Sequence, residues 1–152
     1  MRGFTLIEVL LTMTLMVILI AAAVPLYTNL QVSAQLNESA DQLTQTIRLA
    51  RSRSALRLNN AQHGIYFYSD PSGQDWYTLF QGSSYASRDV AYDRTVTLDN
   101  ALALTSSFSG GVIEIVFTRS QGEPSVTGTV TLTHATYGSR TLSINATGTV
   151  GR

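Results

Sequence analysis

A single carboxylate, Glu8, lies inside the longest apolar run of the chain, which extends from Phe4 to Val24. These 21 residues would form a helix roughly 31 Å long, about the thickness of the hydrocarbon core of a bilayer. A charged side chain costs roughly 2.5–3.5 kcal/mol at the centre of a membrane, and less near the start of a helix. Pairing with a positive group is the chemistry that would offset this cost, so the sequence predicts a partner for Glu8.

Three interpretations of this segment stay open on the residues alone. The segment is an ordinary membrane anchor, in which the dipole at the helix N-terminus favours Glu8. Alternatively it is a secretory signal peptide cleaved near residues 21–23 (Ala-Ala-Ala), although the basic leader Met1-Arg2 is short and Glu8 interrupts the apolar core. In the third interpretation the chain is cut between Gly3 and Phe4, and the new amine of Phe4 neutralises Glu8 on the same or a neighbouring subunit.

A second group of charges lies downstream, where four arginines occur with no acidic residue among them: Arg48, Arg51, Arg53 and Arg57. At 100° per helical residue the first two share one side and the last two nearly the opposite side, so no single stripe results. These arginines complement a helix C-terminus and solvate its surface. The alternative is that, together with Arg152, they contact a partner or the phosphates of DNA.

Other chemistry has little support in the sequence. Cysteine is absent, which excludes disulfides and thiol catalysis, and no phosphate-binding loop or nucleophile elbow is present. His63 and His134 are far apart and are expected to be surface or hydrogen-bonded residues. Five aspartates could supply oxygen ligands, but their spacing fits turns rather than a calcium loop: Asp70, Asp75, Asp89, Asp93 and Asp99. We therefore expect no enzymatic activity, no cofactor and no metal.

The elements that position these groups begin with a long helix. Formal net charge is zero, and no basic residue follows Arg2 until Arg48, so the positive-inside rule places the N-terminus in the cytoplasm. Pro25 predicts a kink after the apolar segment. The pattern then becomes amphipathic as far as about Leu58, and Asn59-Asn60 end the helix. One face of this second part is small or apolar at three- and four-residue spacing: Leu36, Ala40, Leu43, Ile47, Ala50 and Ser54.

Period-two alternation follows the helix. Residues 65–68 and 76–80 flank a turn-forming stretch and predict a hairpin, residues 81–94 are expected to be a loop, and further strands are predicted at 95–98, 112–119, 125–133 and 141–146. Such alternation is typical of half-buried antiparallel strands. The sequence therefore predicts an α+β fold, in which a long N-terminal helix packs on an antiparallel sheet or sandwich.

The run Gly3-Phe4-Thr5-Leu6-Ile7-Glu8 resembles the N-terminal signature of type IV prepilins and pseudopilins. The resemblance implies cleavage after Gly3 by the prepilin peptidase, N-methylation of Phe4 and a role for Glu8 in subunit assembly; Pro25 falls where these proteins place a helix-kinking proline. It divides the chain into a leader (1–3), a transmembrane and assembly helix (4–25), an amphipathic continuation (26–60) and a periplasmic β-rich domain (61–152).

Residues 128–132, 139–144 and 148–150, with the arginine-rich segment 48–53, resemble the GspH/FimT group of minor subunits. This implies a minor pseudopilin of a type II secretion system that helps to initiate or cap the pseudopilus; the alternative is a FimT-like minor type IV pilin serving pilus assembly or DNA uptake. Implied partners are other pilins or pseudopilins, the prepilin peptidase, an inner-membrane assembly platform and membrane lipid. Only one arginine, Arg152, lies at the C-terminus, which argues against DNA as a partner. The implied location is the bacterial inner membrane, in a single pass.

Overall fold

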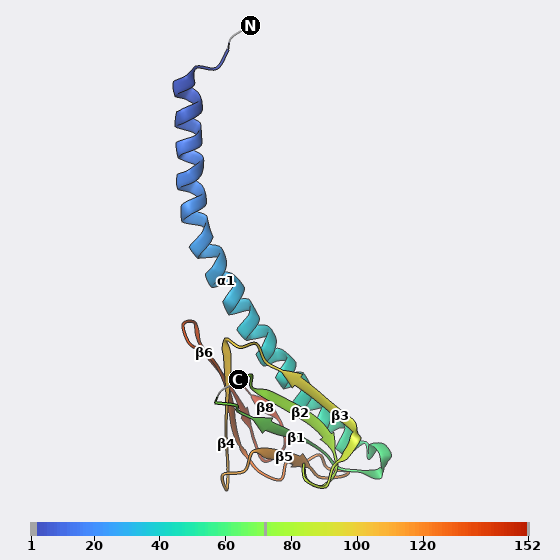
Figure 1. Ribbon diagram of the computed structural model, residues 1–152. Helices are drawn as coiled ribbons and strands as arrows, with labels where there is room; N and C mark the ends of the chain where they lie inside the picture. The colour runs from blue at the N-terminus through green and yellow to red at the C-terminus, as the bar shows by residue number, and fades with distance from the viewer. Residues whose placement is uncertain (1–2, 72, 152) are drawn as a thin grey trace. The chain divides into compact units, whose positions relative to one another are not determined.

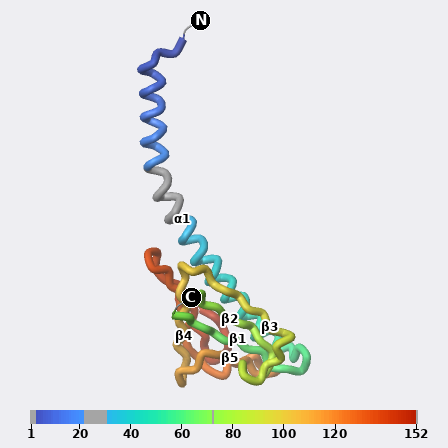
Figure 2. The backbone as a smooth tube through the Cα atoms, in the orientation of Figure 1, coloured from blue at the N-terminus to red at the C-terminus, as the bar shows by residue number. Residues whose placement is uncertain are grey.

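The computed structural model describes residues 3–71 and 73–151, without the side chains of residues 22–30 (grey in Figure 2). The chain separates into two compact units, Met1–Gln35 and Leu36–Arg152. The helices are α1 (Leu6–Ala55) and the short 3-10 helix η1 (Leu58–Asn60). The strands are β1 (His63–Tyr68), β2 (Trp76–Gln81), β3 (Asp89–Thr97), β4 (Leu102–Phe108), β5 (Glu114–Phe117), β6 (Gly128–His134), β7 (Gly138–Ile144) and β8 (Val150–Gly151).

The strands of the second unit form two antiparallel four-stranded sheets, in the orders β3-β2-β1-β5 and β4-β6-β7-β8 (Figure 1). In the first sheet β1 pairs with both β2 and β5, so Ile65 lies opposite Leu79 on one side and Ile115 on the other. In the second sheet β6 pairs with β4 along its whole length, from His134 opposite Leu102 to Gly128 opposite Phe108. A helix followed by antiparallel strands confirms the predicted α+β class.

One hydrophobic core joins the second part of α1 to both sheets. The helix residues predicted to face the core are all fully buried: Leu36, Ala40, Leu43, Ile47, Ala50 and Ser54. They meet inward-facing residues of the first sheet such as Phe67 and of the second sheet such as Phe108, whose ring centroids are 5.4 Å apart. Because every residue of this core lies at position 36 or later, the second unit has a complete core of its own.

Two strands differ from the prediction. Residues 89–94, expected to belong to a loop, form most of β3, whose pairing jumps from Arg94 opposite Leu79 to Asp89 opposite Gln81. The extra residues bulge outward and leave Val90 and Tyr92 exposed, so no alternation marks this strand in the sequence. Strand β4 was not predicted at all. It buries Leu102, Leu104 and Phe108, but its alternation is weak because serine and threonine occupy much of its length.

Element ends also differ. Helix α1 ends at Ala55 rather than near Leu58, because Arg57 adopts a left-handed backbone conformation with φ 54°. The strand predicted over 112–119 is shorter: Ile115 and Phe117 are buried as expected, whereas Ile113 lies outside β5 and is 46% exposed. The strand predicted over 141–146 ends at Ile144, and Ala146 is exposed in the turn after β7.

Asp75 connects the two sheets. It precedes β2 and is only 5% exposed, and its carboxylate accepts hydrogen bonds from the backbone N–H of Asp70 (2.7 Å) and of Leu104 (2.5 Å), which lies in β4. Its carbonyl oxygen accepts a third bond from the N–H of Leu98 at 2.8 Å. The aspartate predicted to serve ordinary turn chemistry therefore also fixes one sheet against the other.

We expect Asp75→Ala to lower the free energy of unfolding by about 3 kcal/mol, because two backbone donors lose a charged acceptor and one of them is buried. Urea unfolding of a fragment covering residues 36–152 would measure the change. Asp99→Ala is the matched control: Asp99 accepts one exposed turn hydrogen bond from Ala101, so its loss should cost under about 1 kcal/mol. Equal effects of the two substitutions would contradict the connecting role of Asp75.

Candidate functional site

The first unit carries the signature residues at the start of α1. The helix begins at Leu6, and Thr5 caps it: the N–H of Glu8 lies 3.1 Å from the carbonyl oxygen of Thr5 and 3.4 Å from its hydroxyl oxygen. The Thr-x-x-Glu spacing is that of a capping box, which places a carboxylate in the first turn, where the helix dipole stabilises it. Glu8 thus lies one helical turn beyond Phe4 and close to the predicted cleavage bond.

The side chains that follow Glu8 are apolar on all sides of the helix. Leu11 is 68% exposed and Ile18 60% exposed, and one stripe at three- and four-residue spacing lines a shallow apolar groove: Ile7, Leu10, Leu11, Thr14, Leu15 and Ile18. The hydroxyl groups of Thr12 and Thr14 donate to the carbonyl oxygens of Val9 (2.9 Å) and Leu10 (2.8 Å). The polar side chains here are therefore satisfied within the helix, which suits surroundings of lipid or of other apolar helices.

Among the described residues, no helical stretch is both long and apolar enough to cross a membrane. The side chains of residues 22–30 are not described. These residues include the end of the predicted transmembrane segment 4–25 and Pro25, where the kink is predicted. Arg2 of the leader also lies outside the described residues.

Arg51 is held inside the second unit. Its Nε donates to the carbonyl oxygen of Gly122 at 3.2 Å. Gly122 and Gly148 both have positive φ, and a side chain at either position would run into Arg51. The two glycines therefore leave the space that this arginine fills between the β5–β6 loop and the β7–β8 turn. Arg51, predicted as a candidate contact for DNA or a partner, is used to fix these two loops.

The other candidate arginines are dispersed. Arg48 is exposed, Arg53 is half-buried, and Arg152 lies outside the described residues. Arg57 follows the helix end, and its Nε donates to the hydroxyl oxygen of Ser120 at 2.7 Å. The structure adds one arginine that the sequence analysis did not select: Arg119, whose Nη1 donates to the carbonyl oxygen of Asn60 at 3.0 Å. Its position after a strand gave no signal that it would face the helix end.

Of the two roles expected for His63, surface or hydrogen-bonded, the structure shows the second: the residue is buried and its side chain is hydrogen-bonded to Gln81. Its backbone N–H donates to the Ser54 hydroxyl at 2.8 Å, while its Nδ1 has no hydrogen-bond partner among the described residues. Burial lowers the pKa of His63, the positive charge of Arg53 lowers it further, and a hydrogen bond with Gln81 opposes both effects. The imidazole is therefore held neutral at pH 7, as an ordinary core residue.

A stability loss on acidification is expected from this histidine. Because its folded-state pKa is below the ordinary value of 6.5, the unfolded chain takes up the proton first, and the folded state loses stability as the pH falls from 7 through 6.5 towards the folded-state pKa. Urea unfolding of the fragment 36–152 at pH 7 and pH 5 should show this loss, and His63→Gln should reduce it. His134→Gln, on partly exposed β6, is the control and should leave the loss unchanged; an unchanged loss in His63→Gln would contradict the assignment.

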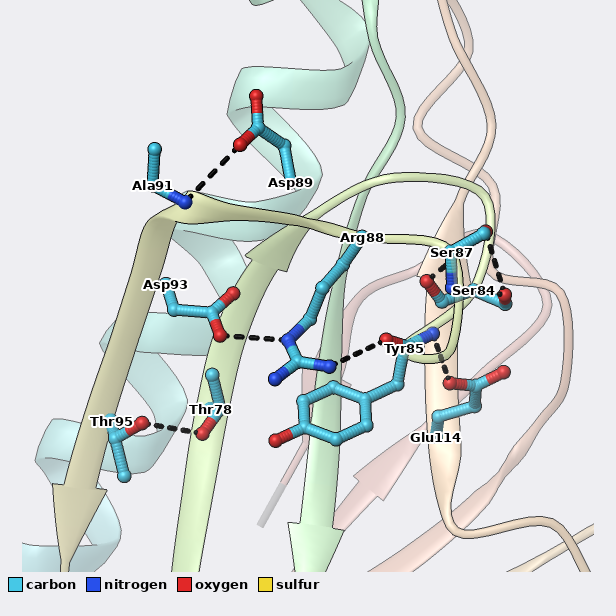
Figure 3. Close-up of polar contacts among 10 residues, drawn as sticks. All are labelled: Thr78, Ser84, Tyr85, Ser87, Arg88, Asp89, Ala91, Asp93, Thr95 and Glu114. Carbon is cyan, nitrogen blue, oxygen red and sulfur yellow. Dashed lines mark hydrogen bonds and ion pairs between the residues drawn. The ribbon is translucent and has the colours of Figure 1, made fainter.

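The loop between β2 and β3 is fixed by a polar and aromatic network (Figure 3). The Arg88 Nε pairs with the Asp93 carboxylate at 2.7 Å, and its Nη1 donates to the carbonyl oxygen of Tyr85 at 2.8 Å. The same guanidinium lies 3.7 Å from the centroid of the Tyr85 ring, and the Tyr85 N–H donates to Glu114 at 2.8 Å. Tyr85 in turn stacks on Tyr66 with centroids 3.9 Å apart. The stretch predicted as a polar loop is therefore ordered.

This loop lies next to an aromatic surface of the first sheet. Trp76 stacks on Tyr68 at 4.9 Å, and Tyr68 is 38% exposed. The bulge of β3, which lies opposite the other end of β2, leaves Val90 and Tyr92 exposed as well. Aromatic and arginine side chains on rigid elements are typical of protein–protein interfaces. The surface is a candidate contact for a partner protein, and its sequence signal was the group of aromatic residues on β1 and β2.

The predicted turn role fits Asp89 and Asp99 but not Asp93, which lies in β3 and forms an ion pair. Asp89 and Asp99 accept hydrogen bonds from the N–H two residues further on, and Asp93 pairs with Arg88. Across the described part of the chain, no three His, Asp or Glu side chains come together as they would around a metal ion.

Comparisons with known proteins agree with this architecture. The family model for the type II transport protein GspH matches residues 39–148, and the model of the prokaryotic N-terminal methylation motif matches residues 1–24. Comparison with curated protein sequences gave no match. The crystal structure of the type IV minor pilin FimU from Pseudomonas aeruginosa is similar to this chain, with a TM-score of 0.56 and 19% identity over 76% of this chain and 90% of that one. At this identity the likeness shows the fold alone.

The two family matches cover the N-terminal signature and most of the second unit. They confirm the predicted resemblance and imply a structural, non-enzymatic subunit that is processed by the prepilin peptidase, anchored in the inner membrane and incorporated with other pilins into a pseudopilus. The chain therefore belongs to the GspH family of type II transport proteins.

Proposed function

We propose that this chain is a minor pseudopilin that helps to initiate or cap the pseudopilus of a type II secretion system and couples it to exported protein. The observation that carries the proposal is the pairing of a GspH-type domain over residues 39–148 with the methylation motif over residues 1–24. Both matches fit a filament subunit, and the GspH-type domain favours a subunit of the secretion type.

The mechanism is assembly rather than catalysis. Cleavage after Gly3 exposes the amine of Phe4, which is then methylated. The apolar face of α1 leaves lipid and packs among the helices of like subunits on the inner-membrane assembly platform, and Glu8 pairs with a Phe4 amine on itself or a neighbour. Support comes from Glu8 in the first turn of α1 and from apolar side chains that the chain itself leaves uncovered.

The test is the culture-supernatant protein profile of an in-frame deletion strain beside its parent and a complemented strain. We expect exoproteins to accumulate in the periplasm of the deletion strain and to return to the medium on complementation. An unchanged profile would overturn the secretion role and move the assignment to a minor type IV pilin, for which surface motility and DNA uptake are the next assays.

A DNA-receptor role has less support. Among the arginines that the structure describes, those that could contact phosphates do not form one surface, because Arg51 bonds within the domain and Arg53 is half-buried. DNA binding supported by several phosphate contacts is strongly salt-dependent. Salt-dependent DNA binding by the full chain, lost on replacing Arg48 and Arg57, would favour this alternative.

A further inference from the structure

An open polar recess of about 360 Å³ lies where α1 ends, and four residues line it: Arg57, Asn60, Arg119 and Ser120. Two of them follow the helix and two follow β5, so segments about sixty residues apart in the sequence build one site. No carboxylate is among the lining residues. Two guanidinium groups therefore face the same recess without an acidic partner in it.

The hydrogen bonds of the recess orient both arginines but use only a few of their N–H donors. Arg57 uses its Nε on the Ser120 hydroxyl at 2.7 Å, and Arg119 uses one Nη on the carbonyl oxygen of Asn60 at 3.0 Å. A guanidinium has five N–H donors, so the two bonds occupy a small part of the ten. The remaining donors form a positively charged, partly fixed site that an anion would satisfy.

The backbone of the same residues is unusual. Arg57, Asn60 and Ser120 have φ of 54°, 52° and 77°, in the left-handed region that non-glycine residues rarely adopt. This conformation is unfavourable for arginine and serine, and less so for asparagine. Glycine would relieve this cost, but at positions 57 and 120 it would remove the guanidinium and the hydroxyl group that bond across the recess; residue 60 contributes its backbone carbonyl oxygen. Strain of this kind clusters at binding sites and switches.

We propose that this recess binds a carboxylate presented by a neighbouring subunit of the filament, an inference that rests on the proposed function. A carboxylate accepts two parallel N–H bonds from one guanidinium, and Arg provides this planar geometry where lysine does not. All ten basic residues of the chain are arginine.

A nucleic acid fits the recess less well. Polyanion binding needs a series of phosphate contacts along a basic track. Beside the recess, however, Arg51 is turned onto the Gly122 carbonyl and Arg53 is half-buried, so the track is interrupted. Arg48 lies in a separate, smaller recess with Gln121. The recess holds two positive charges. One acidic side chain of a protein carries one negative charge, and an acidic residue at a chain end, with its two carboxylates, carries two. Either fits the charge of the recess.

The experiment uses the full-length protein in its own host, with a photo-crosslinking amino acid in place of Leu58, which is 46% exposed and lies between Arg57 and Asn60. In the wild-type background we expect an adduct with another pilin-like subunit. The double variant Arg57→Glu/Arg119→Glu should reduce the adduct at least tenfold. Arg57→Gln/Arg119→Gln should do the same without placing an acid at the helix end. Arg48→Glu lowers the charge by two units, as the double glutamine variant does, but lies on α1 outside the recess and should leave the adduct unchanged.

Steady-state amount and protease resistance of each variant distinguish a lost contact from a lost fold. An adduct that persists in both folded double variants would overturn the proposal, as would a nuclease-sensitive adduct or a wild-type protein that enters the filament without any adduct. Restoration of the adduct in Arg57→Glu/Arg119→Glu by an acid-to-arginine change in the crosslinked subunit would establish the carboxylate. A deletion strain with normal secretion and no filament-associated protein would instead refute the proposed function itself.

Discussion

Glu8→Ala is expected to leave the protein folded and membrane-inserted but to prevent its incorporation into filaments. Glu8 lies in the first turn of α1, where nothing in the described chain covers the apolar side chains around it. In a bundle of such helices the methylated amine of Phe4 needs a negative partner, since an unpaired charge left in apolar surroundings costs about 3–5 kcal/mol. Incorporation should therefore fall by roughly two to four orders of magnitude.

The measurement is the amount of the variant in the sheared filament fraction relative to the membrane fraction. Glu8→Gln keeps the size and hydrogen-bonding capacity of the side chain but not its charge, so it should fail in the same way. Glu38→Ala is the control, because Glu38 is an exposed acid on the same helix but beyond the apolar segment. Normal incorporation of Glu8→Ala would refute the pairing of Glu8 with the amine.

The core-facing side of the helix could be predicted because a single physical rule decides it. One face of the helix carries apolar residues at helical spacing: Leu36, Ala40, Leu43 and Ile47. Side chains on that face can be buried only by packing against the sheets. Strand β6 was equally predictable, since Val130 and Leu132 alternate with threonines on a half-buried strand. In both cases the local pattern and the tertiary fold agree.

Elements fixed by tertiary contacts could not be predicted. The bulge of β3 depends on a register change against β2, which no local pattern encodes, and its exposed Val90 and Tyr92 contradict burial rules. The recess at the end of α1 depends on residues with a left-handed backbone conformation after the helix. It also depends on Arg119, which follows β5 and donates a hydrogen bond to the carbonyl oxygen of Asn60. The sequence grouped Arg48, Arg51, Arg53 and Arg57 by charge alone. The glycines that make room for Arg51, Gly122 and Gly148, are distant in sequence, so its separate role could not be predicted.

Processing of the leader is expected to depend on Gly3. Gly3→Leu is expected to abolish processing. The protein would then keep its three-residue leader and have the mass of the unprocessed form. The reason is steric: the peptidase must approach the backbone between residues 3 and 4, and a glycine leaves that backbone uncovered. Nothing lies within 4 Å of a side chain added at Gly3, so the substitution does not disturb the folded chain itself.

Mass spectrometry of the membrane-fraction protein would measure the cleavage, and Thr12→Leu supplies the control. That change also adds an apolar side chain to an exposed position near the N-terminus, but beyond the cleaved bond, so normal processing is expected. Unprocessed Gly3→Leu protein also lacks a free amine at Phe4, and Glu8 then has no partner at that position. Gly3→Leu should therefore reproduce the filament defect of Glu8→Ala, and mature protein of normal mass in Gly3→Leu would exclude cleavage at this bond.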